Sequence, residues 1–151
     1  MNRSFKSRAA LLALFITSAS PEAHAGFGVG RPSCLSTLSA YHGLVEALRS
    51  QAEEATIACD AASTSGATCA VARTVRDAAN YAASRRTTLA AYALGMVGYG
   101  EAHWALSGVE GMLGAASSRG AAQTDGWHRV RKAWDAVGDS VAECEIARRG
   151  G

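Results

Sequence analysis

Several features that are missing from this sequence exclude whole classes of function. Its 151 residues carry Lys+Arg 15 against Asp+Glu 13, so neither sign of charge dominates. A protein that binds nucleic acid through charge needs a strongly basic surface, and this balance gives no reason to expect one. Charged residues are 19% of the chain and hydrophobic residues 48%, a composition that excludes a disordered chain. The length suits a single domain.

Motifs of the common catalytic and cofactor sites are also missing. The chain contains no Gly-x-Ser-x-Gly turn for a nucleophile, no glycine-rich phosphate loop and no His-Glu-x-x-His zinc motif. The absence of Cys-x-x-Cys argues against a zinc site and against an attached c-type haem. We therefore predict a protein that is not an enzyme and that has no catalytic residue, metal site or cofactor.

The first 25 residues have the three parts of a secretory signal peptide. A start with three basic residues is followed by a short apolar run, residues 9–18, and by small residues at positions 23 and 25. The run is too short to span a bilayer, which takes roughly 20 residues in a helix. We expect cleavage after Ala25 and export by the Sec route, because the basic start lacks paired arginines. The protein is predicted to be periplasmic or secreted.

Cleavage would remove the whole excess charge of the chain. Residues 1–25 contain three basic residues and one acid, a net charge of +2, which equals the formal charge of the full chain. Residues 26–151 then hold twelve basic and twelve acidic side chains and have no net charge. Attraction to nucleic acid or to anionic lipid would have to come from local patches.

Hydrophobic residues spaced alternately by three and four positions predict amphipathic helices. The first such seam runs from Cys34 to Cys59, and the second runs from Val71 to Met96, interrupted only by Arg85. Two further seams follow before the C-terminus. We expect one domain, residues 26–151, with four helices at about 34–60, 68–98, 101–116 and 125–149.

Four cysteines remain after cleavage, and an exported protein folds under oxidising conditions, so we expect two disulfides. Short loops make sequential helices antiparallel neighbours. The end of the first helix then meets the start of the second, which pairs Cys59 with Cys69. The end of the fourth helix returns to the start of the first, which pairs Cys144 with Cys34. The predicted fold is an all-α, antiparallel (up-down-up-down) four-helix bundle with the disulfides Cys34–Cys144 and Cys59–Cys69.

Three residues at the start of the third predicted helix, or just before it, indicate a binding surface. Trp104 lies off the helix face that carries Leu106 and Val109, and tryptophan is enriched at binding hot spots. Tyr99 and His103 are close to it along the chain, so we predict that Tyr99, His103 and Trp104 contact a partner. The sequence favours an interaction protein whose partner is an envelope or secreted protein. A chaperone, an inhibitor or immunity factor, and an accessory of a secretion apparatus all fit.

A glycine-rich segment, residues 87–114, allows a second interpretation. It begins with 14 uncharged residues and carries glycines spaced by three, at positions 95 and 98 and again at 108, 111 and 114. Small residues let helices approach closely, inside a bundle or in lipid. We favour packing inside the bundle, because the uncharged run is too short to span a membrane and Glu101, His103 and Glu110 interrupt its continuation. A membrane-active protein is the alternative function.

A bundle that binds b-type haem or a metal is the other alternative. Met96 and Met112 could ligate haem iron together with His42 or His103. Met96 lies on a hydrophobic seam, however, where core packing already accounts for it. Three further pairs of polar residues have helical spacing but do not make a complete metal or acid–base site: His42 with Glu46, Asp125 with His128, and His103 with Glu110.

Overall fold

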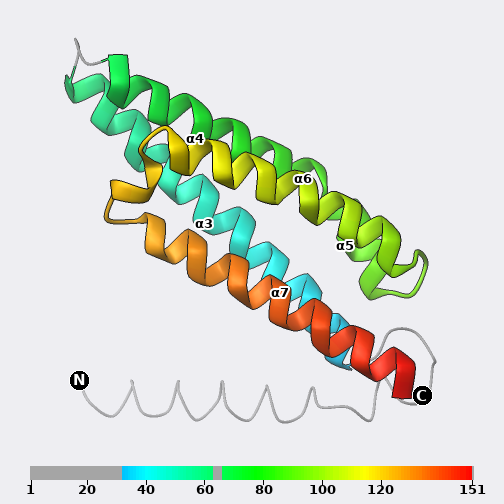
Figure 1. Ribbon diagram of the computed structural model, residues 1–151. Coiled ribbons are helices and arrows are strands. Elements are labelled where there is room, and N and C mark those ends of the chain that lie inside the picture. The colour runs from blue at the N-terminus through cyan, green and yellow to red at the C-terminus, as the bar shows by residue number, and fades with distance from the viewer. Residues whose placement is uncertain (1–31, 63–65, 151) are drawn as a thin grey trace, which may run out of the picture.

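The computed structural model describes residues 32–62 and 66–150 (Figure 1). These residues form helices and connecting turns, and none of them lies in a β-strand, so the predicted all-α class is confirmed. The predicted signal peptide, residues 1–25, lies outside the described residues. The elements in chain order are α3 (Pro32–Ala62), α4 (Gly66–Ser84), α5 (Arg86–Ala93), α6 (Tyr99–Ser118), the 3₁₀ turn η1 (Ala121–Gln123) and α7 (Trp127–Gly150).

The hydrophobic seams of the sequence supply the core. Helix α3 is central, because it packs against α4, α5 and α7, whereas α6 packs on α4 and α5 (Figure 1). The helices turn their seams toward these neighbours and leave most polar residues outside, although Thr37, Gln51 and Ser140 are buried. Fully buried side chains come from all five helices and include Leu48, Val75, Leu89, Val109 and Val137.

The prediction of one continuous helix over residues 68–98 is wrong. The structure breaks it at Arg85, between α4 and α5, and ends it at Ala93. Gly95 follows with φ 78°, a left-handed conformation that glycine adopts without strain and that commonly ends a helix. Because the helix stops there, Met96 leaves the hydrophobic seam, and its side chain is 75% exposed instead of being part of the core.

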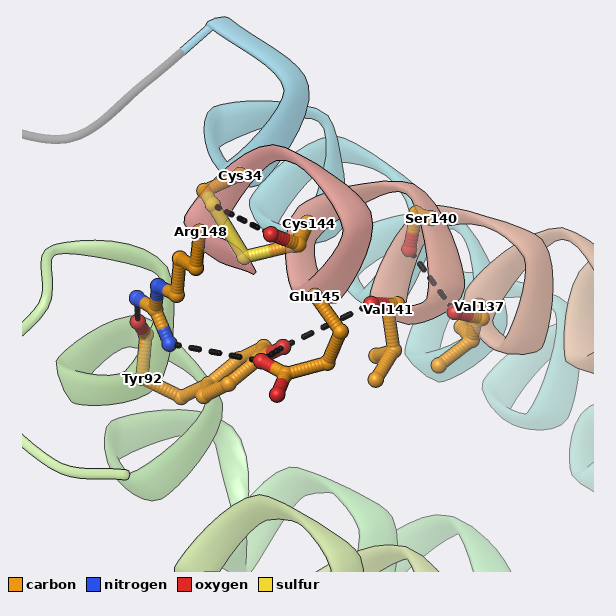
Figure 2. The surroundings of a disulfide bond; sticks show 8 residues. All are labelled: Cys34, Tyr92, Val137, Ser140, Val141, Cys144, Glu145 and Arg148. Carbon is orange, nitrogen blue, oxygen red and sulfur yellow. Dashed lines mark hydrogen bonds and ion pairs between the residues drawn. A yellow bond between two sulfur atoms is a disulfide. The ribbon is translucent and has the colours of Figure 1, made fainter. Parts of the chain in front are cut away.

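Two disulfides join the cysteines in the predicted pairs. Cys34 in the first turn of α3 is bonded to Cys144 in α7 (Figure 2), and Cys59 in α3 is bonded to Cys69 in α4. The Cα atoms are 4.4 Å apart in the first pair and 4.7 Å apart in the second. The two bonds therefore attach α7 to one end of α3 and α4 to the other.

One glycine of the glycine-rich segment allows close packing, and two others do not serve this purpose. A Cβ atom on Gly108 of α6 would collide with the Tyr81 hydroxyl of α4. Gly111 and Gly114 are exposed, and a Cβ atom on either would meet no other atom within 4 Å. The interpretation that these glycines serve packing inside the bundle therefore holds at Gly108 and is wrong for Gly111 and Gly114.

Candidate binding surface

Large hydrophobic side chains remain exposed where α5 turns into α6. Leu94, Met96, Tyr99 and Trp104 are 38%, 75%, 44% and 65% exposed. We call residues 94–104 the α5–α6 corner. These side chains are outside the core because α5 ends at Ala93 and the chain must reverse before α6 begins. A concentration of exposed apolar side chains is typical of an interaction site.

The corner contains all three residues predicted to contact a partner. Tyr99, His103 and Trp104 lie in the first two turns of α6, and all three are exposed. The Tyr99 hydroxyl lies 3.5 Å from Nδ1 of His103, and the two ring centroids are 5.5 Å apart. Tyr99 and His103 thus form one edge of α6, and Trp104 lies on the other edge, facing Arg85.

A cation holds Trp104 in position. The guanidinium carbon of Arg85 lies 4.9 Å from the centre of the Tyr81 ring and 5.3 Å from that of Trp104. Cation–π contacts at accessible sites contribute about 0.5–1 kcal/mol each. Trp104 is therefore exposed but anchored at its base, and a side chain held in this way loses less entropy in any contact that it makes. The sequence showed Arg85 only as a polar interruption of a seam, because its two aromatic partners come from different helices.

An apolar groove of about 410 Å³ lies between α6 and α7. Tyr99 and Leu106 line it from α6. Apolar side chains of Val141, Ala142 and Ile146 line it from α7, together with the charged residues Glu145 and Arg149. It lies here because α6 packs mainly on α4 and α5, whereas α7 packs mainly on α3. The groove is continuous with the corner through Tyr99, so both belong to one surface. No periodicity in the sequence could indicate it, since it depends on the distance between two helices.

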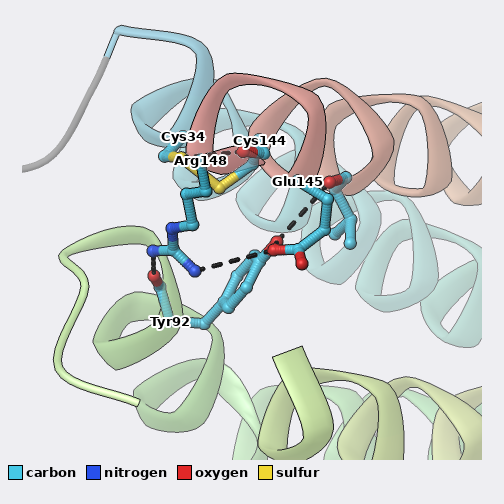
Figure 3. Close-up of polar contacts among 6 residues, drawn as sticks. Cys34, Tyr92, Cys144, Glu145 and Arg148 are labelled. Atoms are coloured by element: carbon cyan, nitrogen blue, oxygen red, sulfur yellow. Dashed lines mark hydrogen bonds and ion pairs between the residues drawn. A yellow bond between two sulfur atoms is a disulfide. The ribbon is translucent and has the colours of Figure 1, made fainter. Parts of the chain in front are cut away.

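A polar cluster ties the end of α5 to α7 beside this groove (Figure 3). The buried Tyr92 hydroxyl donates to Oε2 of Glu145 at 2.6 Å, and Nη1 of Arg148 lies 3.8 Å from the same oxygen. Arg148 also donates to the main-chain carbonyl of Tyr92, and its guanidinium carbon lies 4.3 Å from the centre of the Tyr92 ring. The cluster adjoins the disulfide between Cys34 and Cys144 (Figures 2 and 3), so the ends of α3, α5 and α7 are joined at one place.

Two buried tyrosines should make the protein sensitive to alkaline pH. Burial raises the pKa of Tyr41 and of Tyr92 well above the ordinary value near 10, and the hydrogen bond to Glu145 raises that of Tyr92 further. Their contribution to stability is complete below pH 10 and declines at higher pH, because the unfolded chain ionises first. We expect the free energy of unfolding in urea to fall above pH 10 by up to about 1.4 kcal/mol per pH unit for each tyrosine.

The matching control for this pH dependence is the pair of substitutions Tyr41→Phe and Tyr92→Phe. Phenylalanine cannot ionise, so the doubly substituted protein should lose stability less steeply between pH 10 and pH 12. An unchanged slope would show that other groups cause the alkaline unfolding.

The residues that could ligate haem iron or a metal lie on different elements. Met96 is exposed at the corner, Met112 packs against the core from α6, and His42 is exposed on α3. Among the described residues, no group of three or more His, Cys, Asp or Glu side chains is placed to hold a metal ion. In residues 32–62 and 66–150, no helix combines the length and the apolar character needed to cross a membrane.

No protein-family model, no curated protein and no solved structure matches the chain. A function can therefore be argued only from the protein's own residues. The corner and the adjoining groove are the part of the described surface where exposed apolar and aromatic side chains are concentrated.

Proposed function

We propose that this protein is exported, is not an enzyme, and acts by binding another envelope or secreted protein through the α5–α6 corner. The observation that carries the proposal is the concentration of exposed hydrophobic side chains in residues 94–104, next to an apolar groove. Soluble monomers rarely expose large apolar patches unless these bind something. Tryptophan and tyrosine, which Trp104 and Tyr99 supply here, are among the residues that most often carry binding energy.

The proposed scaffold is an antiparallel, up-down-up-down four-helix bundle that is exported after cleavage of residues 1–25. Export would place the four cysteines in an oxidising compartment, where disulfides form and persist. Such crosslinks suit a thin core: ten of the 25 buried hydrophobic residues in the described part are alanines, which bury little apolar area each. A crosslinked bundle would present the corner as a preformed surface.

Crosslinking in the cell tests this function. A photo-crosslinking amino acid at position 104 should capture a partner, whereas the same amino acid at position 57 should not. Ile57 is the matched control, because it is 69% exposed but lies on α3, outside the corner. The substitution Trp104→Ser should abolish recovery of that partner with the purified protein, and Ile57→Ser should leave it unchanged. Equal capture from both positions, or recovery unaffected by Trp104→Ser, would contradict the proposal.

Dye release from anionic liposomes separates a protein partner from a lipid surface. We expect no release at micromolar protein, because residues 26–151 have no net charge that would attract anionic lipid. Release that is lost in the Trp104→Ser protein would instead assign the corner to membrane contact.

A further inference from the structure

We propose that the corner is completed by a second copy of this chain, whose α6 packs antiparallel against α6 of the first copy. This inference rests on the proposed function, because it names the partner of the same surface. It arises from the outer face of α6, which is exposed along the length of the helix and includes His103, Trp104, Ser107, Glu110, Gly111 and Gly114.

The outer face of α6 is poor in charge for an exposed helix. Only Glu101 and Glu110 carry a formal charge among residues 99–118. Exposed helix faces are normally covered by charged and polar side chains. Here small residues surround one large aromatic side chain, Trp104, which is 65% exposed and anchored by Arg85. The distance between two packed helices depends on the side chains at their contact, so this face permits a close approach.

The fold of a single chain does not account for the glycines of this face. Glycine is less favourable than alanine inside a helix. A Cβ atom on Gly111 or Gly114 would meet no atom within 4 Å, so nothing inside the molecule requires the side chain to be absent. Gly108 differs, because its Cβ would collide with Tyr81. Gly43 of α3 and Gly138 of α7 are equally open, so an open glycine alone does not mark a contact. Gly111 and Gly114 differ because they share a face with the exposed Trp104, and a surface that approaches from outside would use this combination.

The face is complementary to itself about a two-fold axis at Ser107. In an antiparallel pair, residues at similar distances before and after Ser107 lie opposite each other, and each edge of the face meets the same edge of the second copy. Trp104 and Gly111 are seven residues apart, or two turns, and share one edge. His103 and Glu110 are also seven residues apart and share the other edge.

This symmetry places a large side chain over a vacant position and a base beside an acid. Each Trp104 lies over Gly111 of the second copy, where a helix with a larger residue would clash. Each His103 lies opposite Glu110 of the second copy, so the polar residues of the face are paired twice. An isologous contact of this kind uses the same patch on both subunits and closes as a dimer.

Charge and contact area fit a reversible dimer. Residues 26–151 have no net charge, so two copies do not repel each other at long range. A 20-residue helix is about 30 Å long and about 10 Å wide, so one face of α6 supplies on the order of 300 Å². The exposed residues Leu94, Met96 and Tyr99 extend this area at one end of α6. The total stays below the roughly 800 Å² per partner of standard interfaces, so we expect a weak dimer with a dissociation constant of about 100 µM.

Sedimentation velocity of the mature protein, with both disulfides intact, tests this dimer. We expect a concentration-dependent dimer, and we expect Gly111→Leu to raise its dissociation constant at least tenfold by filling the site of Trp104. Gly43→Leu is the matched control, because Gly43 is also an exposed helical glycine whose Cβ would meet no atom within 4 Å. Both substitutions replace an exposed helical glycine by leucine and should alter helix stability similarly, so a difference in dimerisation between them reflects the dimer contact.

Two further variants test the antiparallel arrangement. His103→Glu places two acids opposite each other and should weaken the dimer about tenfold, whereas adding Glu110→Lys to it should restore the affinity to within about threefold. A short bifunctional thiol reagent should join two copies through Ser107→Cys, which lies on the two-fold axis. It should not join them through Ser50→Cys, which is exposed on α3.

The dimer and the proposed function can fail separately. The proposed dimer is wrong if the protein stays monomeric at several hundred micromolar, or if Gly111→Leu leaves dimerisation unchanged. In either case, crosslinking in the cell from position 104 to a different protein would still support the proposed function, with a partner that is not a second copy. If position 104 captures neither a second copy nor another protein, both are wrong.

Discussion

Removal of the disulfide between Cys34 and Cys144 should lower the free energy of unfolding by about 5 kcal/mol. The bond joins residues 110 positions apart, so it restricts most of the unfolded chain, and the entropy cost of closing a loop increases with its length. We expect this loss for the combined substitutions Cys34→Ala and Cys144→Ala, measured by urea denaturation. Domains have total stabilities of about 5–15 kcal/mol, so the substituted protein should be close to unfolding.

The second disulfide is the matched comparison. Cys59 and Cys69 are ten positions apart, and the same entropy argument predicts a loss of about 3 kcal/mol when both are replaced by alanine. Cys34 and Cys144 are buried whereas Cys59 and Cys69 are partly exposed, so lost sulfur packing adds to the larger effect expected for the first pair. Equal losses would show that the contacts around each bond, and not loop length, determine its contribution.

Replacement of Tyr92 by alanine should cost about 3–5 kcal/mol, the usual range for a large aromatic side chain in a core. Tyr92 is fully buried, and it contacts α7 through both its ring and its hydroxyl. Tyr92→Phe should cost about 1–2 kcal/mol, because it keeps the ring and removes the hydroxyl, which bonds to Glu145 at 2.6 Å and contacts the Val141 carbonyl at 3.5 Å. Urea denaturation measures both losses.

The same substitution should also loosen the corner. Because Tyr92 lies two residues before the helix turns at Leu94, amide hydrogen exchange of residues 94–98 should become faster in the Tyr92→Ala protein. Tyr99→Phe is the control: Tyr99 is exposed, so its effect on stability should stay within about 0.5 kcal/mol. Unchanged exchange at residues 94–98 would show that Tyr92 does not anchor the corner.

Much of the helical structure was predictable because burial follows local periodicity. The seams placed Tyr41, Leu48 and Val137 inside, and the structure buries all three. The break at Arg85 was not predictable in this way. Arg85 was visible as the one polar residue on the seam, but the spacing of three and four continues in register from Val75 to Tyr92 on both sides of it. The spacing therefore did not indicate that the helix breaks there. Gly95 was a visible signal for the end of α5, because glycine commonly follows the last helical residue.

The binding surface was predictable only in part. Trp104 could be placed outside the core from its position relative to Leu106 and Val109, and the structure exposes it. Its contact with Arg85 could not be inferred, since Arg85 belongs to another part of the chain. Exposure of Met96 was missed because the seam was extended to it past Gly95, whereas α5 ends at Ala93.

The sequence by itself determined which face of most helices is buried and which cysteines form pairs. Both depend on regular spacing along one helix and on the order of helices in the chain. Only the tertiary structure decided that Gly108 packs against Tyr81 while Gly111 faces open space, and that α6 and α7 leave a groove between them. These features depend on distances between helices, which are set by the packing of many side chains together and have no counterpart in the spacing of any one segment.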